Sequence, residues 1–173
     1  MIYIGIDPGL DGAVAIINDS KEITVKITPT IGKTNKQIDL KKFHEIFEYL
    51  PTNDIMCVIE DVHAIFGCSA GSTFSFGQAF MAPKAICMCA RIQHTLVQPK
   101  KWQEVMHEGI PIMYKPLKEG QKIPTKDTKA MSLMALNRLF PNFDARVSTK
   151  AKNPHDGIVD AVLIAEYCRR MYK

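Results

Sequence analysis

Two apolar runs that each end in a carboxylate constrain the fold of this chain most strongly. Ile2–Asp7 alternates as a strand does, and Ile55–Glu60 is apolar on both faces, as a central buried strand should be. Between them, apolar residues recur at helical spacing over positions 40–50. Strand, helix, strand makes a crossover, so we expect parallel strands with Asp7 and Glu60 at neighbouring carboxyl ends.

The remaining segments predict an α/β domain that spans residues 1–173. Turn residues at 8–12 and the apolar runs 13–17 and 23–28 make the opening an antiparallel meander of three strands. Further along, the patterns predict the following elements: a loop over 29–37, a loop over 61–73, a helix over about 73–91, a strand at 95–97, a short helix over 99–102, an exposed loop over 109–124, a helix from about 125 to 140, a basic linker over 142–152, and a last helix from about 153.

Two more carboxylates, Asp156 and Asp160, open the last helix on the face that carries Leu163, Ile164 and Tyr167. One turn apart, or roughly 6 Å by helix rise, they could bracket metal ions. Asp156 alone could simply complement the helix dipole after an Asn153 cap, but that does not account for Asp160 on an apolar face. Four carboxylates brought together would form a cage for hard cations such as Mg²⁺.

Charge is unevenly distributed along the chain, although the net charge is only +4. Residues 84–152 hold 13 Lys and Arg against 5 Asp and Glu, whereas residues 1–83 hold 6 against 10. This distribution fits a polyanion-facing surface around an acidic pocket, and solvated lysines would give the same count.

The composition also bears on location. No stretch approaches the length of a membrane span, and the five cysteines lack a zinc-like pattern of spacing. Cys57 and Cys168 lie in apolar runs and are interpreted as core thiols of a reducing compartment, so we expect a cytoplasmic protein with no membrane contact.

Six motifs, in order, give the chain a resemblance to the RuvC-like Holliday junction resolvases, especially the compact forms of phages and some bacteria. They span nearly the whole chain: Gly5–Gly9, Val58–His63, Ser72–Gly77, Pro99–Trp102, Lys126–Lys129 and Asn153–Ala161. The resemblance implies a ribonuclease H-like fold with a five-stranded mixed sheet flanked by helices, usually as a homodimer. It also implies nicking of four-way DNA junctions with Mg²⁺ or Mn²⁺, two ions per site, in a bacterial or phage-infected cell.

The same resemblance implies that Asp7, Glu60, Asp156 and Asp160 are the metal-binding acids. One departure concerns the last pair. Some members separate these two acids by three residues, whereas here the separation is four, and Gly157 occupies the three-residue position. Asp160 is therefore the firmer candidate, and Asp156 could support the site without touching a metal.

Candidate nucleic-acid-binding residues lie between the acids. Lys126 and Lys129 are predicted to begin a helix, where N–H groups and ammonium ions favour phosphate; each could equally be a solvated helix start. Lys100 and Lys101 could extend the groove, next to a Trp102 expected in the core.

Aromatic residues in the segment after Glu60 correspond to a family region that inserts near the junction centre. Phe66, flanked by small polar residues, is the better candidate to stack on an unpaired base. Phe74 is a second candidate, although Phe74 and Phe76 are rather expected to pack on the helix that follows. His155 could be a ligand, a proton carrier or an exposed helix-start residue.

Three alternative functions remain open. An RNA-processing or flap nuclease of the same fold would share the sheet and the metal chemistry. A sugar-kinase-like or actin-like ATPase also has a phosphate loop after a first strand, but the chain is short for two such lobes and lacks a second glycine-rich motif. A catalytically silent nucleic-acid-binding relative would not need all four acids.

Overall fold

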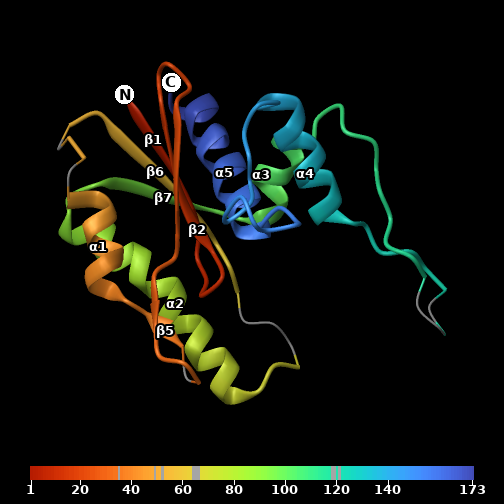
Figure 1. The fold of residues 1–173 in the computed structure, drawn as a ribbon, viewed down its shortest axis with the longest axis horizontal. Helices are drawn as coiled ribbons and strands as arrows, with labels where there is room; N and C mark the ends of the chain where they lie inside the picture. The colour runs from red at the N-terminus through yellow and green to blue at the C-terminus, as the bar shows by residue number, and fades with distance from the viewer. Residues whose placement is uncertain (35, 49, 52, 64–66, 118–119, 121) are drawn as a thin grey trace.

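A five-stranded mixed sheet forms the centre of the molecule. The structure is a computed structural model and describes residues 1–34, 36–48, 50–51, 53–63, 67–117, 120 and 122–173. The strand order is β3-β2-β1-β6-β7 (Figure 1). The first three strands pair antiparallel as the predicted meander, and the last two add parallel to the first. Their bounds are β1 Ile2–Asp7, β2 Ala13–Asn18, β3 Ile23–Ile27, β6 Ile55–Glu60 and β7 Gln93–Val97. The predicted fold class is confirmed.

Helices cover both faces of the sheet (Figure 1). On one face lie α1 (Leu40–Glu48) and α2 (Ala70–Cys89), and on the other lie α3 (Pro99–Met106), α4 (Thr128–Leu139) and α5 (Asp156–Tyr172). Because strand side chains alternate, β1 contributes to two separate cores: Tyr3 packs with the second group of helices, and Ile4 and Ile6 pack with the first. The sheet is therefore buried on both sides.

α5 packs so closely on the sheet that glycine is required beneath it. A Cβ at Gly5 would lie 2.1 Å from the backbone nitrogen of Ala165, nearer than any side chain tolerates. All residues of α5 from Gly157 to Cys168 except Asp160 are buried. α5 is thus a nearly enclosed helix, although the sequence predicts one apolar face, and its last residues, such as Met171, are exposed.

Several predicted boundaries are wrong. Residues 29–37 are not all loop, because β4 (Thr30–Ile31) and β5 (Gln37–Ile38) form a short hairpin. α2 begins at Ala70, where the Ser69 side chain accepts a hydrogen bond from the Ser72 N–H. α5 begins at Asp156 with His155 as its N-cap, so Asn153 is not the cap. Element ends depend on local capping, which apolar periodicity does not record.

The segment between α3 and α4 projects from the body of the molecule (Figure 1). Its two arms are joined by backbone hydrogen bonds from Lys115 to Thr125 and from Asp127 to Met113. No helix in the described part of the chain is long and apolar enough to cross a membrane. As predicted, Cys57 and Cys168 are buried and free.

Candidate active site

Asp7 and Glu60 end neighbouring strands, as predicted. β1 and β6 pair parallel with Ile6 opposite Ile59, so the next residue of each strand emerges at the same edge of the sheet. Glu60 is buried and Asp7 is half-buried. The crossover through α1 therefore delivers two carboxylates to one place, at the carboxyl ends where open α/β sheets build their sites.

The first two turns of α5 bring the other two acids to this edge. A Cβ at Gly157 would lie 2.4 Å from the Asp11 carbonyl oxygen and 3.1 Å from Oδ2 of Asp7. Glycine thus lets α5 begin directly against the turn after β1. Asp160, one turn further along, is half-buried, whereas Asp156 is exposed. We refer to these four residues, Asp7, Glu60, Asp156 and Asp160, as the acid cluster.

The acid cluster is a place of strong mutual repulsion. Burial raises the pKa of Asp7 well above its usual value, and the charges of Glu60, Asp160 and Asp156 raise it further. Burial and the Glu60 charge raise the pKa of Asp160 to about 7. Burial also raises the pKa of Glu60. Carboxylates held this close without a compensating cation are costly to ionise, and they mark the edge of the sheet as a candidate functional site.

Trp102 of α3 and Ser132 of α4 provide polar contacts to the acids, and His107, the C-cap of α3, contacts Ser132. Trp102 donates a hydrogen bond from Nε1 to Oε1 of Glu60 at 2.8 Å, which opposes the rise in the pKa of that acid. Ser132 hydrogen-bonds the Asp160 side chain and lowers its pKa, against the effect of burial. His107 Nε2 lies 3.1 Å from the Ser132 hydroxyl oxygen.

These supporting contacts go beyond what the sequence predicted. Trp102 is fully buried, as expected of a core residue. A buried indole N–H requires an acceptor, and that requirement was the available signal for its role. His107 and Ser132 are 25 positions apart in the sequence, on either side of the projecting segment, and no motif pairs them.

The lysines predicted to bind nucleic acid differ in their contacts: all are exposed, and one of them is also ion-paired with the acid cluster. Lys129 lies in the first turn of α4 and forms an ion pair with Asp156 of the acid cluster. Lys126 is exposed but precedes Asp127, the N-cap of α4, so the prediction that it begins the helix is wrong. Lys100 and Lys101 are exposed in the first turn of α3, as a nucleic-acid contact requires.

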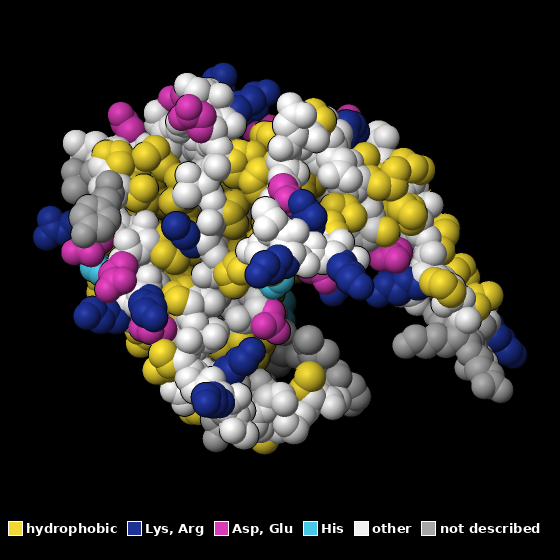
Figure 2. All heavy atoms as spheres, viewed as in Figure 1, with side chains coloured by type: hydrophobic (Ala, Val, Ile, Leu, Met, Phe, Trp, Pro, Cys, Tyr) yellow, Lys and Arg dark blue, Asp and Glu magenta, His cyan; other side chains and the backbone are white. Residues whose placement is uncertain are grey.

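A cleft of about 380 Å³ separates α3 from α4, and Lys100 and Lys126 both line it. On the same side, the molecule is hollowed between its lower part and the projecting segment, and Lys and Arg side chains gather along the rim (Figure 2). Of the predicted lysines, Lys129 contacts the acid cluster through Asp156, and Lys100 and Lys126 line the cleft between α3 and α4.

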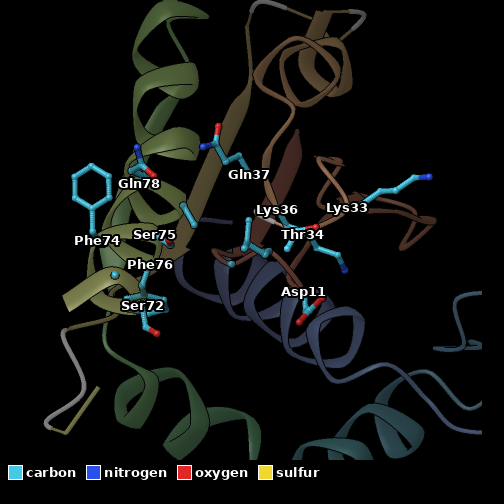
Figure 3. Close-up of a pocket in the computed structure, with 14 residues that line it drawn as sticks. Asp11, Lys33, Thr34, Lys36, Gln37, Ser72, Phe74, Ser75, Phe76 and Gln78 are labelled. Atoms are coloured by element: carbon cyan, nitrogen blue, oxygen red, sulfur yellow. The ribbon is translucent and has the colours of Figure 1, made fainter. Parts of the chain in front are cut away.

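The aromatic candidates lie either outside the described residues or in α2. Phe66 lies outside the described residues. Phe74 is a residue of α2 with 68% of its surface exposed, so the expectation that it packs on a helix is wrong. Phe76 is half-buried. Both line a cleft of about 860 Å³ between α2 and the β4–β5 hairpin, where Phe74 extends outward from α2 (Figure 3).

His155 is half-buried, and its Nδ1 is buried without a hydrogen-bond partner among the described residues. The prediction of an exposed helix-start histidine is therefore wrong. A buried ring nitrogen next to Asp156 is a potential donor or ligand at the edge of the acid cluster.

The acid cluster fits a divalent cation in charge and in ligand type. Its donors are carboxylate oxygens, which Mg²⁺ and Mn²⁺ prefer, and a cation would relieve the repulsion that raises the pKa values of Asp7 and Asp160. Within the described residues, however, no three Asp, Glu, His or Cys side chains already converge on one point. The predicted four-carboxylate cage is thus not assembled, and Asp156 would have to release Lys129 to join it.

Comparison with solved structures agrees with the architecture. A structure titled Thermus thermophilus RuvC in complex with Holliday junction substrate matches with a TM-score of 0.52 at 14% identity, covering 99% of this chain and 97% of that chain. A second Thermus thermophilus RuvC structure matches with a TM-score of 0.52 at 15% identity, covering 99% and 96%. No family model and no curated protein matches the sequence.

The chain therefore has a ribonuclease H-like fold, similar in structure to RuvC over nearly its full length. At this identity, the likeness defines the fold alone.

Proposed function

We propose that this protein is a metal-dependent endonuclease that cuts four-way DNA junctions. The observation that carries the proposal is the meeting of the acid cluster at one edge of the sheet, where, besides burial, the charges of Glu60, Asp160 and Asp156 raise the pKa of Asp7, and those of Glu60 and Asp156 raise the pKa of Asp160. Isolated acids turned to solvent would not do so. Repelling carboxylates can accept the negatively charged phosphates of a nucleic acid only when cations are bound with them.

The acid cluster would hold Mg²⁺ or Mn²⁺, two ions per site, through Asp7, Glu60 and Asp160, with Asp156 as a further candidate. When bound, such ions activate a water molecule and stabilise the leaving oxygen in phosphodiester hydrolysis. The chain's own residues orient the acids: Trp102 holds Glu60 through its N–H, and Ser132 contacts Asp160. Neither a serine nor a histidine nucleophile is needed.

The choice of branched DNA is supported by the similar RuvC structure, whose title describes a Holliday junction complex. It is also supported by exposed Lys129, which pairs with Asp156, and by exposed Lys100 and Lys126 in the cleft between α3 and α4, which would position phosphates without reading bases. Roles in recombination and repair, a cytoplasmic location and assembly as a homodimer belong to the same proposal.

A cleavage assay tests the proposal. Four-way junction, flap, linear duplex and RNA–DNA hybrid would be compared with and without Mg²⁺. Paired symmetric nicks on the junction, only with metal, are the expected result. Preferred cutting of the flap or the hybrid would instead identify a flap or RNA-processing nuclease of the same fold.

An Asp160→Asn variant provides the control for the active site. Its cleavage should be abolished, while its affinity for the junction should be largely retained, because the amide keeps the shape of the side chain but is a much poorer ligand for a hard cation. Strong metal-dependent nicking by a clean preparation of this variant would overturn the assignment.

A further inference from the structure

Helix α3 is connected to two members of the acid cluster by different routes. Trp102, in its middle, bonds Glu60 directly at 2.8 Å. His107, its C-cap residue, lies 3.1 Å from the hydroxyl of Ser132, and Ser132 hydrogen-bonds Asp160. α3 therefore contacts Glu60 directly, and its C-cap residue is linked to Asp160 through Ser132 of α4.

The number of available protons determines which group donates in each hydrogen bond between His107, Ser132 and Asp160. An ionised Asp160 only accepts hydrogen bonds, and the Ser132 hydroxyl has a single proton to give. Ser132 therefore donates to Asp160 and accepts from His107. This arrangement requires the His107 tautomer with its proton on Nε2, so the two bonds fix the imidazole as well as the carboxylate.

Burial and packing around Ser132 and His107 stabilise these two hydrogen bonds. Ser132 is only 1% exposed, so water does not compete for its hydroxyl. His107 is half-buried and packs edge-on against Trp102, with ring centroids 6.3 Å apart. The burial of His107 lowers its pKa, which keeps the ring neutral. The remaining open side of His107 faces the cleft between α3 and α4.

We propose that His107, acting through Ser132, is a positioning residue that holds the Asp160 carboxylate in the orientation for binding a divalent cation. The inference rests on the proposed function, because it takes Asp160 as a metal ligand. Partners that hydrogen-bond metal ligands orient them, and their loss typically weakens metal affinity by roughly 10- to 100-fold. Trp102 gives Glu60 the same kind of support by a direct bond.

The experiment measures Mn²⁺ binding to the metal-free protein by titration calorimetry, without DNA. Ser132→Ala and His107→Phe should each weaken binding about 10- to 100-fold. His107→Gln keeps a donor and should restore most of the affinity. Thr28→Val is the matched control, because Thr28 is also a buried hydroxyl but its oxygen has no hydrogen-bond partner in the described structure; its affinity should equal that of the wild type.

A double variant separates the two residues. If His107 acts through Ser132, adding His107→Phe to Ser132→Ala should cause no further loss of affinity. If the double variant loses as much additional affinity for Mn²⁺ as His107→Phe does alone, His107 does not act through Ser132. A folded Ser132→Ala protein with wild-type affinity for Mn²⁺ would also overturn the proposal. If Ser132→Ala unfolds in a thermal melt, Ser132→Cys replaces it, since the thiol is a weak donor. A wild-type protein that binds no Mn²⁺ would contradict the proposed function instead.

Discussion

At the scale of single residues, the acid cluster is a compromise between stability and function. Asp7, Glu60 and Asp160 all have raised pKa values, so each resists ionisation in the folded protein. An acid with a raised native pKa binds protons more tightly in the folded than in the unfolded chain. Stability is therefore lost as pH rises from the unfolded value of about 4 to the native value.

This effect predicts that Asp160→Asn stabilises the metal-free protein. For Asp160, the loss develops between about pH 4 and its native pKa of about 7, and it is complete above that pH. Melting curves in a chelator should show a higher Tm for the variant at pH 8, by about 2–4 °C per kcal/mol of relieved repulsion.

The difference in Tm between variant and wild type should disappear below about pH 4, where Asp160 becomes protonated in both the folded and the unfolded state. At pH 8 the difference should shrink when Mn²⁺ is added, because the bound cation stabilises the wild type. Equal Tm values at pH 8 would contradict the electrostatic description of the cluster.

The residues of the site differ in how far sequence could predict them. Asp7 and Glu60 each end an apolar run, so strand pairing alone placed them together. Asp160 stood out as a charge among buried neighbours. His107 and Ser132 could not be found in this way, because their partnership exists only once α3 packs against α4. Local patterns encode elements, whereas contacts between elements depend on packing.

At the scale of elements, α3 and α4 present cations to the outside and hydrogen-bonding groups to the inside. Lys100 and Lys126 line the outer cleft, while Trp102 and Ser132 contact the acids from behind. The loop lengths and the small β4–β5 hairpin were not predicted, since two-residue strands leave no periodicity to detect. The helices were predicted with shifted ends, because capping decides the ends.

The lysines predict a specific salt dependence of junction binding. Lys126→Ala and Lys129→Ala should each weaken binding to all sequences and make the plot of log affinity against log salt shallower by roughly one phosphate contact. Filter binding or fluorescence anisotropy across a salt series measures the slope.

Lys41→Ala, an exposed lysine of α1, is the matched control and should leave the slope unchanged. Asp156→Asn should have the opposite effect on affinity, because it frees Lys129 from its ion pair. A slope that both alanine variants leave intact would remove these lysines from the binding surface.

The far end of α5 carries an ion pair that predicts acid sensitivity. Glu166 is buried, and burial alone would raise its pKa, but hydrogen bonds from Arg169 and Arg170 lower it overall. A lowered native pKa gives stability that is present above the unfolded value of about 4.3 and is lost as pH falls through the native value.

Glu166→Gln should therefore destabilise the protein at pH 7 by about 2 kcal/mol, or about 4–8 °C in Tm. The difference from the wild type should shrink progressively as pH falls below about 4.3, toward and through the lowered native pKa of Glu166. Thermal unfolding followed by circular dichroism measures both. A constant difference across this pH range would show that packing, and not charge, is responsible.

At the scale of the whole molecule, the two faces of the sheet are unlike in what they expose. The acid cluster and its lysines belong to the side of α3, α4 and α5, whereas α2 exposes three large apolar residues spaced seven apart. These are Phe74, Met81 and Met88, exposed by 68%, 52% and 70%. Such a row on one helix is typical of a protein–protein contact.

The proposed homodimer predicts that this row is covered by a second copy. Sedimentation equilibrium should give twice the chain mass of 19.4 kDa for the wild type. Met81→Glu places a charge in the row and should yield monomers, while Lys41→Glu on α1 should remain dimeric. A monomeric wild type, or a Met81→Glu protein that stays dimeric, would contradict this arrangement.

The close packing of α5 on the sheet has a consequence for the time at which the proposed nuclease could become active during synthesis. Glu60 and Asp160 are separated by 100 positions in the chain. At about 5–20 residues per second, a ribosome needs about 5–20 seconds to travel between them. During that interval the nascent chain already has its sheet acids but not the helix that Gly5 and Gly157 admit. A proposed nuclease built in this order cannot cut the nucleic acids around it until α5 has been synthesised.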